Sequence, residues 1–410
     1  MSSSPSKSAS FVREAIRTMS AYTLEPLLAA DKLDQNESPW DLPPGLKEEV
    51  LARISKRSWN RYPEFGLDRI RGAVASYAGI ARDEVLVGNG SNELLLATLA
   101  TFVAPGAPVV RVDPTFALYE KITRIMGGIS IPVAGDPASG VLPVEEMVAA
   151  IETCERPPVV IVCSPNNPTG ASLREGQLET LLATGAMVIL DRAYGEFGEN
   201  PDAVRPRERL VILSTFSKAW GLAGLRIGWL AATPENCREI SKVKLPYNLN
   251  LFSEEAALVA LENPDLVRER TAALRAERVR LSAELGAMEG VRPFPSEANF
   301  IAFETTMNPN ELYRELASRG TLVRDISGYP GMSRALRVSV GAPEENDRFL
   351  GALREAMAAH LIVSNGGRSE RMEDLALPGE REATSLASSE RDAPTGEERL
   401  RRNSRGESND

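Results

Sequence analysis

Residues 159–170 read Val-Val-Ile-Val-Cys-Ser-Pro-Asn-Asn-Pro-Thr-Gly, an apolar run that leads directly into a turn with two prolines and two asparagines. A short apolar run bounded by turn residues is typical of a strand that is buried on both faces. The turn would place amide groups at the carboxyl end of this strand, and in open α/β sheets ligands bind at that end. The segment therefore predicts a buried parallel strand followed by part of a binding site.

Similar apolar runs recur along the chain and alternate with amphipathic stretches such as 93–103 and 173–183. This alternation predicts an α/β fold, with a mostly parallel sheet covered by helices. The other runs that we expect to form strands of this sheet are 84–87, 109–112, 187–190, 210–213 and 227–231.

The pattern changes in the second half of the chain. A long helical pattern covers 254–288 and is broken at Asn263-Pro264, because proline lacks a backbone donor. Shorter elements follow, which we interpret as a smaller α+β domain. We expect a large domain over 40–262, a small domain over 263–362, and a segment 11–39 that packs on the small domain. The shorter elements are expected at 299–303, 311–318, 321–324, 335–340 and 344–360.

The two ends of the chain differ from the rest in composition. Residues 1–10 are rich in serine, and residues 363–410 combine many charges with few apolar residues and no aromatic residue. Such segments bury too little apolar surface to offset the entropy lost on ordering. We expect both to be disordered.

The composition argues against several classes of protein. A net charge of -10 argues against a protein that coats nucleic acid, and no apolar run is long enough to predict a membrane span. The three cysteines form no Cys-x-x-Cys pair, which favours the reducing cytoplasm. The single histidine, His360, argues against a Ser-His-Asp triad and most zinc sites, so we expect no metal.

A second strand-to-turn segment contains a candidate nucleophile. Residues 213–229 read Leu-Ser-Thr-Phe-Ser-Lys-Ala-Trp-Gly-Leu-Ala-Gly-Leu-Arg-Ile-Gly-Trp, so Lys218 lies among hydroxyl side chains and near Arg226. A neighbouring cation disfavours the ammonium form of a lysine and makes its amine more nucleophilic. This arrangement suits anion binding or imine formation, although the segment alone is equally compatible with an ordinary surface lysine.

Two further segments contain candidate binding groups. Asp191 ends the apolar run 187–190, where an unpartnered carboxylate would be costly, so it either caps a helix or pairs with a cationic group of a ligand. Residues 87–93, Val-Gly-Asn-Gly-Ser-Asn-Glu, precede a helical pattern, and free amides at a helix start bind phosphate. The glycine spacing is neither Gly-x-Gly-x-x-Gly nor a Walker A loop, which weighs against NAD and ATP.

In order and spacing, these segments resemble the fold-type I pyridoxal-phosphate aminotransferases, and further motifs narrow the resemblance to the histidinol-phosphate aminotransferase family. The resemblance extends over residues 12–361. The further motifs are Leu33-Asp-Gln-Asn-Glu-Ser-Pro39, Arg61-Tyr-Pro-Glu-Phe-Gly66, Asp113-Pro-Thr-Phe116, Glu297-Ala-Asn-Phe300, Val323-Arg-Asp325 and Leu336-Arg-Val-Ser-Val-Gly341.

The resemblance implies a pyridoxal 5'-phosphate cofactor. Lys218 would bind this cofactor covalently and then move the α-proton of the substrate, while Asp191 would pair with the pyridine nitrogen and keep the ring an electron sink. Asn167 and Tyr194 would hydrogen-bond the 3-oxygen of the ring. The remaining cofactor contacts would come from Phe116, stacked on the ring, and from Ser91, Asn92, Ser217 and Arg226 at the phosphate.

The resemblance also implies substrate contacts and a homodimer. Tyr62 would reach the phosphate of the cofactor in the partner subunit, and Tyr22 would close over the substrate from the other subunit. Arg337 would bind the substrate carboxylate through its planar fork, with Asn299 orienting it. Arg324 would bind the substrate phosphate.

The implied partners are a small-molecule amino donor and a 2-oxo acid. The implied reaction converts L-histidinol phosphate and 2-oxoglutarate into imidazole acetol phosphate and L-glutamate, as a ping-pong exchange through pyridoxamine phosphate. Related enzymes with another substrate stay open as alternatives: an aromatic aminotransferase, a threonine-phosphate decarboxylase or an aminotransferase of secondary metabolism. A more remote alternative is a regulator that binds the cofactor but has no catalytic activity.

Two positions depart from the pattern of the family. Phe116 stands where the family usually has tyrosine, so ring stacking would survive but one hydroxyl would be lost. Arg192 follows Asp191 where the family usually has glutamate, and we expect its side chain to face away from the cofactor.

Overall fold

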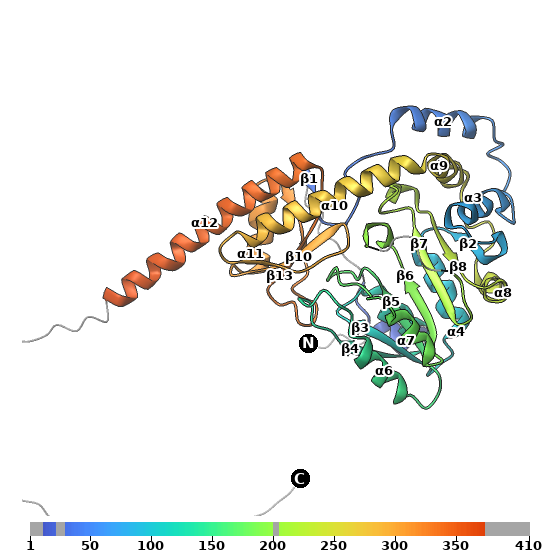
Figure 1. The fold of residues 1–410 in the computed structure, drawn as a ribbon, viewed down its shortest axis with the longest axis horizontal. Helices are drawn as coiled ribbons and strands as arrows, with labels where there is room; N and C mark the ends of the chain where they lie inside the picture. Colours follow the sequence, from blue (N-terminus) through green and yellow to red (C-terminus); the bar gives the residue numbers. More distant parts are fainter. Residues whose placement is uncertain (1–10, 22–28, 200–204, 374–410) are drawn as a thin grey trace, which may run out of the picture. The chain divides into compact units, whose positions relative to one another are not determined.

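A computed structural model describes residues 11–21, 29–199 and 205–373, with side chains described as far as Leu361. Its largest sheet has seven strands in the order β2-β8-β7-β6-β5-β3-β4 (Figure 1). Strands β3 to β7 pair in parallel, whereas β8 runs antiparallel to both β2 and β7. The strands are β2 (Val85–Gly88), β3 (Pro108–Asp113), β4 (Ile129–Ala134), β5 (Val159–Cys163), β6 (Met187–Asp191), β7 (Leu210–Thr215) and β8 (Gly228–Ala231).

The six strands predicted for this sheet are confirmed, and so is the α/β fold class. The edge strand β4 was not predicted, and its composition explains why. Its sequence Ile-Ser-Ile-Pro-Val-Ala contains Pro132, and only Val133 is buried, so it lacks the continuous apolar run of a central strand. Proline is tolerated in an edge strand because one side of the strand has no ladder partner.

Helices cover the large sheet and bury its central strands. Every residue of β5 and β7 is buried. Helix α4 contacts β2, β7 and β8, whereas α7 contacts β6, and Figure 1 shows α4 behind the sheet and α7 in front of it. The helices of this region are α2 (Pro44–Ser55), α3 (Asp68–Ala78), α4 (Ser91–Phe102), α5 (Leu118–Met126), α6 (Val144–Glu152), α7 (Gln177–Ala183), α8 (Pro234–Val243) and α9 (Leu251–Glu262).

A second, antiparallel sheet has the order β12-β13-β10-β9, and β1 (Asp31–Lys32) pairs in parallel with β11 (Thr321–Leu322) beside it. The predicted break at Asn263-Pro264 is confirmed, because α9 ends at Glu262 and a new helix begins at Pro264. The other elements are α10 (Pro264–Gly286), β9 (Val291–Pro293), β10 (Phe300–Thr305), α11 (Pro309–Ser318), β12 (Arg324–Asp325), β13 (Ala335–Ser339) and α12 (Pro343–Glu373).

The N-terminal segment differs from our expectation that residues 11–39 pack on the small domain. Helix α1 (Glu14–Arg17) lies against α5 instead, where Lys121 Nζ donates to the carbonyl of Ser20 at 2.8 Å and Arg124 Nη2 donates to Thr18 Oγ1 at 3.1 Å. Two cations on α5 thus bind the hydroxyl of Thr18, which is the C-cap of α1, and the carbonyl of Ser20 just beyond it. The part of the segment that joins the second sheet region is the short strand β1.

The C-terminal helix also differs from expectation. Helix α12 continues to Glu373, eleven residues into the segment 363–410 for which we expected disorder. No proline interrupts this stretch, although Gly366 and Gly367 disfavour a helix. Residues 1–10 and 374–410 lie outside the described residues. Within the described ranges, no helix combines the length and the apolar character needed to cross a bilayer.

Candidate active site

A pocket of about 610 Å³ lies at the carboxyl ends of β5, β6 and β7. It contains residues from the large sheet, from the second sheet and from the segment before α2. Most of the predicted site residues line it together: Ser91, Asn92, Phe116, Asn167, Asp191, Tyr194, Ser217, Lys218, Arg226, Arg324 and Arg337.

Lys218 follows β7 and projects its amine into this pocket. Its Nζ donates to the backbone carbonyl of Gln35 at 2.7 Å and lies 5.8 Å from the centre of the Tyr194 ring. Burial lowers the pKa of Lys218 to about 7, and the cations Arg337 and Arg226 act in the same direction, while Glu37 opposes them. The amine is therefore available in its neutral, nucleophilic form near neutral pH.

Asp191 is the last residue of β6 and is 5% exposed. Its Oδ1 accepts the backbone N–H of Ala193 at 2.9 Å, and its Oδ2 accepts the hydroxyl of Tyr119 at 2.8 Å. Burial raises the pKa of the Asp191 carboxyl above its ordinary value, and the two hydrogen bonds oppose this rise. The carboxylate lines the pocket, so it is placed to meet a cationic group of a ligand.

Hydroxyl, amide and guanidinium groups converge at one end of the pocket. Thr215 Oγ1 donates to Ser217 Oγ at 3.0 Å, and Arg226 Nη1 donates to the same Ser217 oxygen at 3.2 Å. Gly90 precedes α4 at a φ of +79°, and a Cβ atom there would come within 2.8 Å of Arg226 Nη2. The start of α4, which no described side chain caps, thus lies beside a guanidinium and two hydroxyls. This set of donors fits a phosphate group.

The segment before α2 lines the pocket with backbone as well as side chains. Arg337 Nη2 donates to the carbonyl of Asp34 at 2.8 Å, and Arg337 Nη1 donates to Asn167 Oδ1. Asn36 Nδ2 donates to the Tyr194 hydroxyl at 3.0 Å. The motif 33–39 had pointed to this segment in the sequence. The contacts that the segment makes through its backbone carbonyl groups could not be predicted, because they do not depend on the type of side chain.

Three predicted site residues are placed elsewhere or are not described. Asn299 does not line the pocket but is buried beside it, where its Nδ2 donates to the carbonyl of Asn36 at 3.1 Å. Tyr62 is 80% exposed, lies outside the pocket and stacks on Tyr247 with ring centres 4.5 Å apart. Tyr22 lies outside the described residues. Lining residues that were not predicted include Asp34, Gln35, Asn36, Glu37, Tyr119, Cys163, Thr215 and Tyr329.

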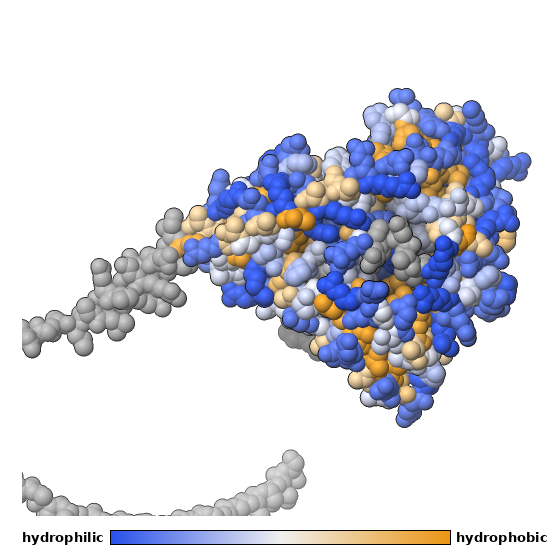
Figure 2. Space-filling model, in the orientation of Figure 1, coloured by the Kyte–Doolittle hydropathy of each residue, from blue (hydrophilic) through white to orange (hydrophobic). Residues whose placement is uncertain are grey.

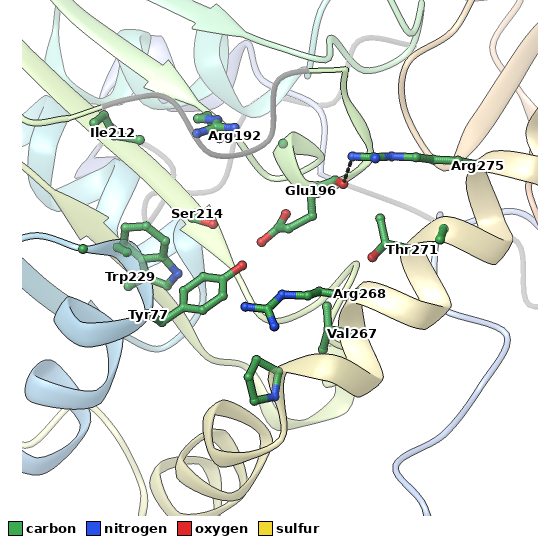
Figure 3. Close-up of a pocket in the computed structure, with 15 residues that line it drawn as sticks. Tyr77, Arg192, Glu196, Ile212, Ser214, Trp229, Val267, Arg268, Thr271 and Arg275 are labelled. Atoms are coloured by element: carbon green, nitrogen blue, oxygen red, sulfur yellow. Dashed lines mark hydrogen bonds between the residues drawn. The ribbon is translucent and has the colours of Figure 1, made fainter.

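A second pocket, of about 410 Å³, lies on the opposite face of the large sheet (Figure 3). Thr215 lines the first pocket and its neighbour Ser214 lines the second, as the alternation of side chains along β7 requires. Arg192 lines the second pocket with Tyr77 and Glu196, so its side chain faces away from Asp191, as expected. Among the residues that the structure describes, none that we predicted to bind cofactor or substrate lines this second pocket.

The sequence matches the family model described as aminotransferase class I and II over residues 31–353. The chain therefore belongs to the aminotransferase class I and II family and is an aminotransferase. Its relatives include the histidinol-phosphate aminotransferase of Chlorobaculum tepidum, 37% identical over 350 residues, with 83% of this chain and 99% of the relative covered. The histidinol-phosphate aminotransferase of Chlorobium phaeobacteroides is 39% identical over 345 residues, with 83% of this chain and 95% of the relative covered. The resemblance inferred from the motifs is confirmed.

Solved structures agree on the fold. The histidinol-phosphate aminotransferase from Sinorhizobium meliloti in complex with pyridoxal-5'-phosphate superposes with a TM-score of 0.77 at 23% identity, covering 85% of this chain and 98% of that one. An aspartate aminotransferase tetra mutant from Thermus thermophilus superposes with a TM-score of 0.70 at 23% identity, and the match covers 84% of this chain and 99% of that one. At this level of identity the likeness shows the fold alone, which is that of the fold-type I aminotransferases.

Proposed function

We propose that this aminotransferase uses pyridoxal 5'-phosphate to transfer the amino group of L-histidinol phosphate to 2-oxoglutarate. The observation that carries the proposal is the position of Lys218 in one pocket with Asp191 and the phosphate-binding groups around Arg226. The names of the relatives support the choice of substrate.

The groups that line the pocket fit this cofactor. Lys218 would bind its aldehyde carbon, Asp191 would face its ring nitrogen, and Phe116 would pack on the ring. Asn167 and Tyr194, which both line the pocket, would hydrogen-bond the ring oxygen. When bound, the cofactor would supply an electron-accepting ring that stabilises the charge left on a substrate carbon after it loses a proton. Ser91, Asn92, Ser217 and Arg226 would bind the phosphate.

Lys218 is suited to move a proton at its Nζ atom. With a pKa of about 7, this amine can both accept and release a proton near neutral pH, as a general acid–base catalyst requires. The carbonyl of Gln35 holds the amine in place at 2.7 Å. A positioned proton carrier of this kind contributes about 10²–10⁴-fold to a rate.

Two arginines would select the substrates. Arg324 on β12 and Arg337 on β13 are directly opposite each other in the antiparallel ladder, and both line the pocket. Arg324 would bind the phosphate of histidinol phosphate, and Arg337 would bind the carboxylate of glutamate or 2-oxoglutarate. Asn299 would act indirectly, because it holds the carbonyl of Asn36 in the segment that Arg337 also binds.

A homodimer would cover the exposed aromatic surface of this chain. Trp59, Tyr62 and Phe65 are 69%, 80% and 73% exposed and lie against Tyr247 and Phe252. Figure 2 shows further apolar side chains over α2 and α9. Exposed apolar patches of this kind mark protein contacts, and Tyr62 would then reach the cofactor phosphate in the partner subunit. The three free cysteines support a reducing, cytoplasmic compartment.

A half-reaction without any 2-oxo acid tests the proposal. The protein with pyridoxal phosphate should be yellow, and histidinol phosphate should bleach this colour faster than phenylalanine does. Faster bleaching by phenylalanine would support an aminotransferase with another substrate and exclude the proposed one. Histidinol phosphate has no carboxyl group to lose, so O-phosphothreonine is tested separately, and release of carbon dioxide from it would indicate a decarboxylase. A protein that gains no colour would contradict the proposal that pyridoxal phosphate is the cofactor.

Arg324→Gln gives a sharper version of this experiment. The variant should react more slowly with histidinol phosphate, by about 10²-fold, because a charged hydrogen bond to phosphate is lost. Its reaction with glutamate should not change. The matched control is Arg334→Gln, since Arg334 lies outside the pocket and donates to the carbonyl of Thr305. Equal losses with both substrates would contradict the role of Arg324.

A further inference from the structure

Tyr119 on α5 contacts Asp191 although the two residues are far apart in the sequence. Its hydroxyl donates to Asp191 Oδ2 at 2.8 Å. The Tyr119 side chain is 1% exposed, and its ring packs edge-on against Phe116 with ring centres 5.6 Å apart. Helix α5 therefore brings a phenol to the carboxylate oxygen that the Ala193 amide does not bind.

The two oxygens of Asp191 are each held by a donor from the protein. Oδ1 receives the N–H of Ala193 at 2.9 Å, and Oδ2 receives the O–H of Tyr119. Two donors on different oxygens fix the rotation of a carboxylate about its Cβ–Cγ bond, whereas one donor does not. Hydrogen bonds to the charged form also favour ionisation of a buried carboxyl group.

Tyr119 is suited to be a permanent donor. Burial and the neighbouring Asp191 charge raise the pKa of Tyr119 well above its ordinary value, so the phenol keeps its proton at any physiological pH. Cys163, which pairs with Asp191 across β5 and β6, is also buried, and burial raises the pKa of its thiol. Neither Tyr119 nor Cys163 therefore adds a second negative charge that would disfavour the ionisation of Asp191.

We propose that Tyr119 is a positioning residue, which holds the Asp191 carboxylate charged and aimed at the ring nitrogen of the cofactor. The inference rests on the proposed function, because that function supplies the cofactor. Tyr119 itself would make no bond to the ring nitrogen and would act entirely through Asp191.

The experiment compares two cofactors on protein freed of cofactor. The first is pyridoxal phosphate, and the second is its 1-deaza analogue, in which a C–H group replaces the ring nitrogen and cannot pair with Asp191. Tyr119→Phe keeps the ring and removes only the hydroxyl. We expect this variant to bind pyridoxal phosphate about tenfold more weakly, as for one lost hydrogen bond to a charged group, and to bind the analogue unchanged. Binding is followed by quenching of tryptophan fluorescence.

A matched control and a double variant complete the experiment. Thr123→Val removes another fully buried hydroxyl from α5, one that donates to the carbonyl of Tyr119 within the helix, and should leave both affinities unchanged. In an Asp191→Asn background, Tyr119→Phe should weaken pyridoxal phosphate binding no further, because residues that act through one another are not additive.

The outcomes separate the inference from the function on which it rests. Equal weakening of both cofactors in Tyr119→Phe would show a packing role and overturn the inference, and so would no weakening of either. Wild-type protein that fails to bind pyridoxal phosphate would overturn the proposed function, and the inference would fall with it.

Discussion

Lys218 and Arg337 donate hydrogen bonds to adjacent backbone carbonyls of one segment. Lys218 Nζ reaches the carbonyl of Gln35 at 2.7 Å, and Arg337 Nη2 reaches that of Asp34 at 2.8 Å. The guanidinium of Arg337 is thereby held near the amine, and it is one of the cations that lower the pKa of Lys218. The group that would bind the substrate carboxylate also adjusts the reactivity of the nucleophile.

This arrangement predicts how the capture of pyridoxal phosphate depends on pH. The pKa of Lys218 falls from its ordinary 10.5 to about 7, so the reactive neutral amine dominates above that pH and falls tenfold per unit below it. The rate at which yellow colour develops in cofactor-free protein should therefore rise with pH, with a midpoint near 7. Arg337→Leu should move the midpoint upward, because one neighbouring cation is lost. A rate independent of pH in this range would contradict the assignment.

Substitution of Lys218 should abolish the activity without affecting the fold. Lys218→Ala should lose the yellow colour and at least about 10³-fold in turnover, because the covalent link and the proton carrier are both removed. In the absence of cofactor, its melting temperature should match that of the wild type, since bound cofactor would itself stabilise the folded state. Lys244→Ala is the matched control: burial also lowers the pKa of Lys244, but this lysine lies outside the pocket and donates to Asn248 Oδ1. The prediction is wrong if Lys218→Ala turns over at a near-normal rate.

The end of the pocket that we propose to bind phosphate should be sensitive to one added methyl group. A Cβ atom at Gly228 would come within 2.4 Å of the Ser91 backbone nitrogen, so Gly228→Ala should displace the start of α4. We expect a loss of about 1–3 kcal/mol in unfolding free energy and weaker cofactor binding. Gly224→Ala is the control, because a Cβ atom there would meet nothing within 4 Å. Urea unfolding and cofactor titration of both variants check this, and equal behaviour of the two would contradict it.

The proposed sharing of sites between subunits predicts complementation. A Lys218→Ala subunit and a Tyr62→Ala subunit should each form weakly active or inactive dimers. In a mixed dimer both defects fall in one site, and the other site is intact. Unfolding and refolding an equal mixture should therefore restore about a quarter of the wild-type activity, as expected for random pairing in a symmetric dimer. Activity no higher than the average of the two separate variants would contradict a site shared between subunits.

Much of the large sheet could be predicted because its strands are buried on both faces. The runs at β5 and β7 contain no charged residue and end in polar turns, so periodicity and composition identify them without further information. The half-exposed edge strand β4 lacks such a run and was missed. The packing of α1 on α5 was also missed, because it depends on Lys121 reaching the carbonyl of Ser20 and Arg124 reaching the hydroxyl of Thr18 in three dimensions.

The candidate site could be predicted where a side chain supplies the function. Lys218, Asp191 and Arg226 stand in recognisable motifs, and the structure gathers them in one pocket. Tyr119 could not be predicted, because its role depends on a contact with Asp191 that only the folded chain makes. Tyr62 illustrates the opposite case, since a motif identifies it as a site residue but the structure leaves it on the surface, outside the pocket.

The contact between Lys218 and Gln35 has a consequence for genetics. The acceptor is the peptide oxygen of residue 35, which all twenty amino acids possess, so no exchange of side chain deletes it. An alanine scan of the pocket would report residue 35 as dispensable even though its oxygen fixes the reactive amine. To expose this contact, the peptide bond itself has to be altered, for example by replacing the amide that follows Gln35 with an ester and thereby weakening the acceptor.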